Sequence, residues 1–195
     1  MKVEVSLVKK IREKTGLPVM ECKKALEEAL GNTEKALEIL KKKGMEIALK
    51  KGKRETSEGL IFSYVHSTGK IGVLLELNCE TDFVAKNDDF KELAKNLALQ
   101  ITAMSPLTVD RKGLSPETIK EKEKWWNEEF SDKPQPIRKK IREGKLNDFY
   151  REKVLLEQIF IKDEKLTIHD YLRSVIAKLG ENISIKRFVR YELGE

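Results

Sequence analysis

The stretch that decides the fold is residues 71–101, which read IGVLLELNCETDFVAKNDDFKELAKNLALQI. Every second side chain from Ile71 to Leu77 is apolar, and this period of two predicts a strand with one buried face. After Asn87, which can cap a helix, apolar residues recur at the spacing of a helical stripe. They are Phe90, Leu93, Ala94, Leu97, Ala98 and Ile101. We therefore expect a buried strand, a short polar turn and a long amphipathic helix.

Further strands and helices are predicted on both sides of this stretch. Residues 59–66 are rich in Ile, Phe, Tyr and Val, and residues 67–70 (STGK) form a hairpin loop with a glycine for positive φ. Residues 117–150 are charged and predicted to be mostly helical. The C-terminal part predicts a strand at 154–161, a helix at 168–179 and a strand at 183–193. Such irregular runs favour an α+β fold, with an antiparallel sheet covered by helices.

The N-terminal part predicts three short helices joined by glycine turns. Ser6 is expected to cap the first helix, and Gly16 to end it, because glycine accepts the left-handed conformation found at helix ends. Asn32 is expected to cap the third helix, and Gly44 to end it. Three helices of about three turns form a compact bundle.

A boundary is expected near residue 55, because apolar residues disappear from Lys50 onward. We divide the chain into a helical module, residues 1–54, and an α+β core domain, residues 55–195. Residues 1–54 carry a net charge of +7 and the remainder −1, so the basic excess belongs to the module. A basic module can bind nucleic acid or an acidic protein. We expect no direct nucleic-acid contact, because lysine runs such as residues 41–43 are more often a solvated face.

Composition favours a cytoplasmic protein without a cofactor. Hydrophobic residues make up 39% of the 195 residues, enough for a packed core. No apolar run approaches the ~18 residues of a membrane span, and the N-terminus lacks the apolar region of a secretion signal. Cys22 and Cys79 lie far apart, without a C-x-x-C partner or a histidine cluster. We therefore expect free thiols, no metal site and no membrane contact.

Two apolar features have both a structural and a functional interpretation. Val19 and Met20 open the second helix, where they either seal the bundle or form an apolar contact for a partner. Phe83 stands in the polar turn between strand and helix. It either folds back onto its own helix or projects outward as an anchor for a partner, as aromatic residues do at interfaces.

An enzyme is a competing hypothesis, with Cys79 as nucleophile and His66 or His169 as base. No spacing brings these residues together, so we expect the chain not to be an enzyme. The role of Trp125 and Trp126, within residues 105–150, stays open among core, dimer interface and partner contact.

Three stretches resemble the elongation factor Ts family. TDFVAKN at residues 81–87, after the strand, is similar to one signature of that family, and TGLPVMECKKAL at residues 15–26 is similar to the other. The closing GENISIKRFVRYELGE at residues 180–195 resembles the family's last strand. Two long independent motifs in the right order are highly specific.

The resemblance implies a guanine-nucleotide exchange factor for elongation factor Tu that binds its GDP form and promotes GDP release. It also implies a ubiquitin-associated-like helical module before a dimerisation-type core. In the family, the module docks on the nucleotide-binding domain of the GTPase, which points to Val19 and Met20. The central motif intrudes between two helices near the magnesium site, which points to residues 81–84, namely Thr81, Asp82, Phe83 and Val84.

Two departures from the family pattern bear on the partner surface. Val19 replaces the first methionine of a pair, which keeps the contact apolar but changes its shape. The chain also holds one core unit where longer relatives carry two similar subdomains. We therefore predict a homodimer that supplies the missing half.

Overall fold

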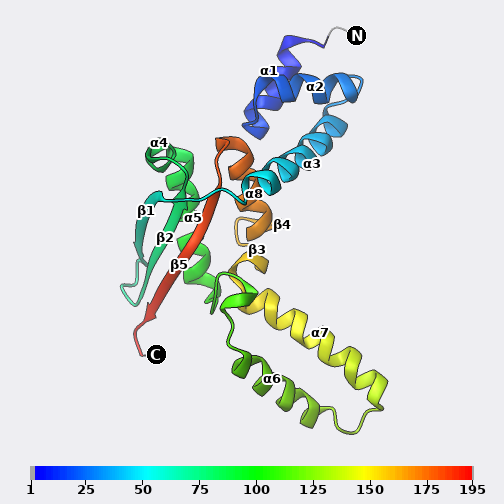
Figure 1. Ribbon diagram of the computed structural model, residues 1–195, viewed down its shortest axis with the longest axis vertical. Helices are drawn as coiled ribbons and strands as arrows, with labels where there is room; N and C mark the ends of the chain where they lie inside the picture. The colour runs from blue at the N-terminus through cyan, green and yellow to red at the C-terminus, as the bar shows by residue number, and fades with distance from the viewer. Residues whose placement is uncertain (1–2, 195) are drawn as a thin grey trace. The chain divides into compact units, whose positions relative to one another are not determined.

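The computed structural model describes residues 3–194 and contains both helices and strands, which confirms the α+β class (Figure 1). Among these residues, no helix is both long enough and apolar enough to cross a membrane. The helices are α1 (Val5–Thr15), α2 (Val19–Glu28), α3 (Thr33–Lys51), α4 (Asp82–Lys86), α5 (Asp88–Met104), α6 (Pro116–Glu129), α7 (Gln135–Lys153) and α8 (Ile168–Leu179). The strands are β1 (Glu58–Val65), β2 (Ile71–Cys79), β3 (Ile159–Phe160), β4 (Asp163–Thr167) and β5 (Ile183–Glu192).

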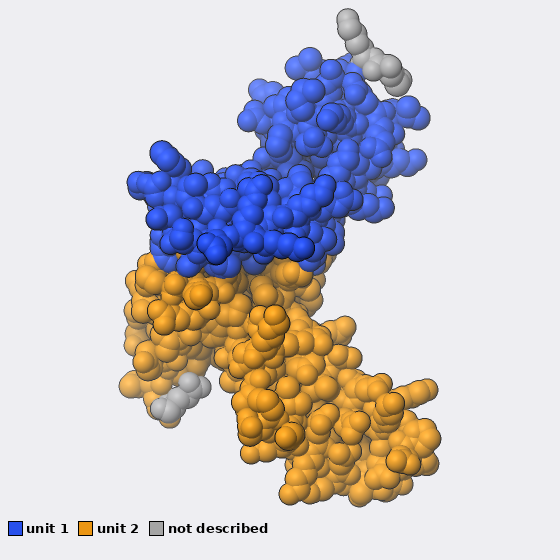
Figure 2. Space-filling view, viewed as in Figure 1, with its two compact units in different colours: residues 1–60, 78–93, 170–184 blue, residues 61–77, 94–169, 185–195 orange. Residues whose placement is uncertain are grey.

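The chain divides into two compact units, each built from three segments (Figure 2). Unit 1 comprises residues 1–60, 78–93 and 170–184. Unit 2 comprises residues 61–77, 94–169 and 185–195. The predicted division after residue 54 follows a different criterion, the fall in apolar content, and it stays a prediction.

The main sheet has the strand order β1-β2-β5, with β2 in the centre. Strands β1 and β2 form the predicted hairpin, in which the N–H of His66 donates to the carbonyl of Ile71 at 2.9 Å. Gly69 in its loop has a φ of +67°, the left-handed conformation for which glycine was expected. Strand β2 buries alternate side chains from Val73 to Cys79. The period of two therefore predicted this strand correctly.

Helix α5 follows the predicted stripe. Asn87 accepts a hydrogen bond from the N–H of Asp89 at 2.8 Å, so it caps the helix as expected. All six apolar positions of the stripe are fully buried: Phe90, Leu93, Ala94, Leu97, Ala98 and Ile101.

Helices α1, α2 and α3 of unit 1 share one buried apolar cluster. It comprises Val8, Ile11, Leu17, Cys22, Ala25, Leu26, Ala29, Ala36, Leu40 and Ala177, the last of which belongs to α8. Gly16 ends α1 with a φ of +66°, as predicted. Asn32 caps α3, accepting hydrogen bonds from the N–H groups of Glu34 and Lys35, both at 3.0 Å.

Two expectations for these helices were wrong. Helix α1 begins one residue before Ser6, because the carbonyl of Glu4 accepts the first helical hydrogen bonds. Helix α3 does not end at Gly44 but continues to Lys51. A Cβ at Gly44 would lie 3.4 Å from the Cβ of Ala177, so this glycine permits a close approach of α8.

Helices α6 and α7 of unit 2 form a hairpin with its own small apolar cluster. Trp126 and Phe149 lie edge to face there, with ring centroids 6.5 Å apart, and Leu114 and Val154 complete the buried group. Trp125, in contrast, is exposed. Trp126 is therefore a core residue of the hairpin, whereas Trp125 is not.

The strand predicted at residues 154–161 is largely absent. Leu155–Glu157 form a 3-10 turn, and only Ile159–Phe160 are extended, paired antiparallel with β4. The cause is Gln158, whose fully buried amide donates to the carbonyls of Glu152 at 2.7 Å and Met104 at 3.4 Å. Such contacts hold the backbone in a turn, because a buried amide must be hydrogen-bonded.

Candidate partner-binding site

The predicted turn between β2 and α5 projects an exposed aromatic ring. Thr81 has an extended backbone and caps the five-residue helix α4, accepting a hydrogen bond from the N–H of Val84 at 3.4 Å. Phe83 lies in the first turn of α4 and is 81% exposed. It therefore does not fold back onto its own helix.

Asp82, beside Phe83, is held in its charged form. Its carboxylate lies 2.6 Å from the ammonium of Lys86, one helical turn further on. The hydrogen bond from Lys86 lowers the pKa of Asp82, and the positive charge of Lys86 acts in the same direction. The tip of the turn thus combines an exposed ring with a neighbouring ionised carboxylate.

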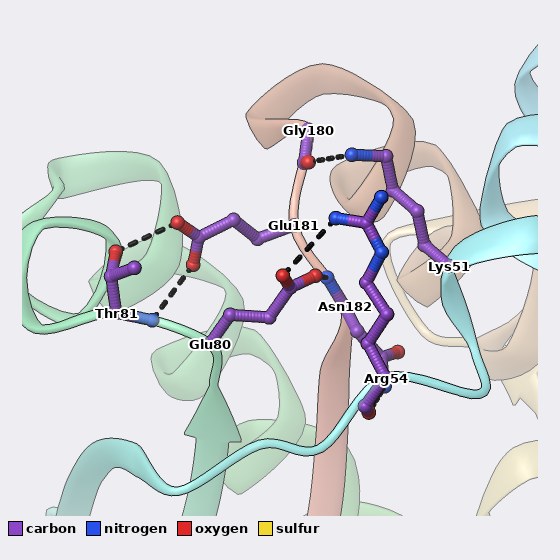
Figure 3. A network of polar contacts seen from close by, with 7 residues as sticks. All are labelled: Lys51, Arg54, Glu80, Thr81, Gly180, Glu181 and Asn182. Atoms are coloured by element: carbon purple, nitrogen blue, oxygen red, sulfur yellow. Dashed lines mark hydrogen bonds and ion pairs between the residues drawn. The ribbon is translucent and has the colours of Figure 1, made fainter.

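Two carboxylates fix the backbone just before this tip (Figure 3). Glu181 accepts hydrogen bonds from the N–H of Thr81 at 3.0 Å and from its hydroxyl at 2.7 Å. Glu80 accepts from the N–H of Asn182 at 2.6 Å, which lowers the pKa of Glu80. The contacts are reciprocal, because each segment supplies a glutamate that binds a backbone N–H of the other.

The same contacts reach the end of α3 and the residues that follow it (Figure 3). Arg54 donates to the carboxylate of Glu80 at 3.2 Å, and its carbonyl accepts from the side-chain amide of Asn182 at 2.7 Å. The ammonium of Lys51 donates to the carbonyl of Gly180. We call this set of seven residues the polar junction: Lys51, Arg54, Glu80, Thr81, Gly180, Glu181 and Asn182.

Cys79 is not suited to nucleophilic chemistry. Its side chain is fully buried, and its sulfur lies 3.1 Å from the carbonyl of Thr81. Burial, reinforced by the negative charge of Glu181, raises the pKa of Cys79 to about 11. His66 bonds to the Tyr64 hydroxyl at 3.2 Å. Within residues 3–194, no three His, Cys, Asp or Glu side chains gather in a way that could hold a metal ion.

Val19 and Met20 lie outside the buried cluster of the three helices. They are 46% and 58% exposed at the start of α2, whereas Cys22, Ala25 and Leu26 of the same helix are fully buried. The two side chains therefore do not seal the bundle. They form a small exposed apolar patch at the start of α2.

Comparison with known proteins shows the family of the chain. Residues 5–195 match the family model described as Elongation factor TS. The chain belongs to the elongation factor Ts family. Elongation factor Ts of Fervidobacterium nodosum is 53% identical over 197 residues, which cover all of both chains. The factors of Thermotoga maritima and Nitratidesulfovibrio vulgaris are 52% and 50% identical, over all of this chain and 98% of theirs.

The elongation factor Ts match includes every residue that the sequence singled out. Of the polar junction, the sequence singled out only Thr81. Glu80 and Glu181 were not predicted as site residues, and their partners lie about a hundred residues away in the chain. The one local signal was the pair of short polar steps, Glu80-Thr81 and Glu181-Asn182, at the edges of predicted strands.

Proposed function

We propose that this chain is a guanine-nucleotide exchange factor for elongation factor Tu, acting in the cytoplasm during translation elongation. It binds the GDP form, disrupts the Mg²⁺ and phosphate site of the GTPase and promotes GDP release. It makes and breaks no covalent bond and is not an enzyme in that sense. The observation that carries the proposal is the exposed Phe83 on its anchored turn, in a chain that matches the elongation factor Ts family over residues 5–195.

Exchange follows from linkage between two binding events. A factor that binds nucleotide-free elongation factor Tu better than the GDP form must weaken GDP binding by the same ratio. A shift of ~10⁴-fold requires ~5.5 kcal/mol of differential binding. The chain therefore needs contacts that form fully only when the nucleotide site is distorted.

Phe83 and Asp82, between Thr81 and Val84, supply such contacts. We place them between two helices of elongation factor Tu near its magnesium site. Mg²⁺ requires near-ideal octahedral geometry at about 2.1 Å, so a small displacement of its ligands releases it. Without the cation, the phosphates of GDP lose a neutralising charge and GDP dissociates faster.

The helical module supplies affinity in this scheme. We assign residues 1–54 as a ubiquitin-associated-like module that docks on the nucleotide-binding domain through Val19 and Met20. Residues 55–195 are then the core that carries the turn. The exposure of both apolar side chains supports this assignment, because partner contacts are made by side chains that the fold leaves free.

An exposed apolar face of the main sheet supports the proposed homodimer. Glu76 of β2 and Arg187 of β5 form a 2.7 Å ion pair, which identifies one face of the sheet. Alternation along the strands places five exposed side chains there: Ile61, Val65, Leu74, Val189 and Tyr191. A sheet face that exposes five apolar side chains around one ion pair suits a second copy of this chain. Leu74→Glu should give a monomer in light scattering, whereas Val5→Glu, at an exposed position of α1, should remain dimeric.

Release of a fluorescent GDP analogue from elongation factor Tu tests the function. Wild type should accelerate release, and the Asp82→Ala/Phe83→Ala double variant should not, although its circular dichroism is unchanged. A well-folded wild type without effect on release would refute the exchange function. Nucleic-acid affinity that falls steeply with salt would then point to the basic module as an RNA-binding element.

A further inference from the structure

Helix α4 contributes no fully buried side chain that would fix the direction of Phe83, although Val84 and Ala85 are half-buried. None of its five residues is buried. Its C-terminal end continues into the cap of α5, where the N–H of Asn87 donates to the carbonyl of Val84 at 3.0 Å. The N-terminal end is held by polar contacts, chiefly those that Glu181 makes with Thr81. The direction of Phe83 therefore depends on hydrogen bonds.

Glu181 holds the backbone at Thr81, two residues before Phe83. Thr81 caps α4, so its N–H, its hydroxyl and its extended backbone set the position at which the helix starts. Glu181 binds both the N–H and the hydroxyl of Thr81, at 3.0 and 2.7 Å, which restricts rotation about the side chain as well. Hydrogen bonds to an ionised acceptor are about twice as strong as neutral ones.

The same junction is tied to the helical module. Lys51, the last residue of α3, binds the carbonyl of Gly180, the residue before Glu181. Arg54, three residues further on, binds the carboxylate of Glu80. A single set of polar contacts thus holds both the end of the module and the start of α4. All seven residues of the polar junction belong to unit 1.

We propose that Glu181, assisted by Glu80, is a positioning residue for nucleotide exchange. Through Thr81 it fixes the direction in which Phe83 projects and ties that direction to the end of α3. The inference rests on the proposed function, which it deepens by naming residues that act without touching elongation factor Tu.

A double-mutant cycle tests whether Glu181 acts through Phe83. Glu181→Ala should lower the maximal rate of GDP release about tenfold, the size expected for losing hydrogen bonds to a charged acceptor. In the Phe83→Ala background, the same substitution should cause no further loss. Glu181→Gln keeps one acceptor oxygen and should recover part of the rate. The matched control is Glu157→Ala, which removes a carboxylate from the ion pair with Arg111 and should leave release unchanged.

A second measurement does not depend on the exchange function. In wild type, the backbone amides of Phe83 and Val84 should have ¹⁵N order parameters near 0.85, as in rigid backbone, and Glu181→Ala should lower them towards 0.6. Glu157→Ala should not change them. Unchanged order parameters in Glu181→Ala, or rate losses that simply add to those of Phe83→Ala, would overturn the positioning role. If the wild-type chain does not accelerate GDP release from elongation factor Tu, the proposed function fails. The order parameters then still decide whether Glu181 fixes the turn.

Discussion

Replacing Met20 and Phe83 one at a time should affect different kinetic parameters. Met20 is proposed to dock, so its loss should weaken binding to elongation factor Tu equally before and during exchange. Phe83 is proposed to act only when the nucleotide site is distorted. Loss of a contact that is made equally before and during exchange raises the factor concentration needed for half of the maximal rate. Loss of a contact that is made only in the transition state lowers the maximal rate itself. Phe83→Ala should therefore lower the maximal rate, and Met20→Ala should raise the factor concentration needed for half of it.

The expected magnitudes follow from the area that each side chain still exposes. Full burial of such a side chain contributes roughly 1.5–3 kcal/mol. Phe83 is 81% exposed and Met20 58%. Scaling by these fractions gives about 1.2–2.4 kcal/mol for Phe83, or roughly 8- to 60-fold in maximal rate, and about 4- to 20-fold in half-saturation for Met20.

Stopped-flow release of a fluorescent GDP analogue from elongation factor Tu, at varied factor concentration, measures both parameters. Trp125→Ala removes another exposed aromatic side chain and serves as the control. All three variants should unfold at the wild-type temperature, because exposed substitutions change stability by less than ~0.5 kcal/mol. If Phe83→Ala changed only half-saturation while the maximal rate stayed at the wild-type value, Phe83 would be a docking residue and the wedge mechanism would be wrong.

Four further predictions concern stability and thiol chemistry. Gly144→Ala, in open space on α7, should raise the free energy of unfolding by up to ~1 kcal/mol, because alanine has the higher helix propensity. Gly44→Ala should raise it by less, because its new methyl group meets α8. Chemical denaturation measures both changes. Cys79, with a pKa of about 11, should react with iodoacetamide at pH 8 about 10²-fold more slowly in the folded than in the unfolded protein. Because this pKa is raised on folding, the thiol's contribution to stability should be complete below about pH 9 and lost as the pH rises through about 11, as pH-dependent denaturation would detect. Trp126→Ala should cost roughly 3–5 kcal/mol in thermal or chemical unfolding of the hairpin, whereas Trp125→Ala should cost almost nothing.

Local periodicity predicted the elements that bury one regular face. The strand from Ile71, the stripe from Phe90 to Ile101 and the cap at Asn87 depend on neighbours a few residues away, and all three were correct. Gly44 was misjudged because the glycine rule for helix ends is local, whereas the reason for this glycine is Ala177, far away in the chain. The turn at 155–157 was missed for the same reason.

The candidate site shows the same difference between what depends on neighbouring residues and what depends on the tertiary structure. Phe83 could be noticed from composition, since an aromatic residue in a polar turn is unusual, but residues 81–84 were assigned as a partner contact only through the resemblance to the elongation factor Ts family. Whether Phe83 and Met20 were free or packed depended on the tertiary structure, which leaves both exposed. The polar junction could not be predicted, because a glutamate gives no local sign of which distant N–H it will bind.

The way the turn is anchored suits the proposed role of Phe83 as a wedge that enters another protein. A ring that packed on its own helix would be well ordered, but its contacts would have to break before it could bind elongation factor Tu. A ring on an unanchored loop would lose conformational entropy on binding, and that loss subtracts from the binding energy available for distortion. The hydrogen bonds that Glu181 accepts from the N–H and the hydroxyl of Thr81 restrict the turn without covering Phe83. Polar anchoring two residues before the ring therefore allows full exposure and a fixed direction together, and a wedge that displaces Mg²⁺ ligands needs both.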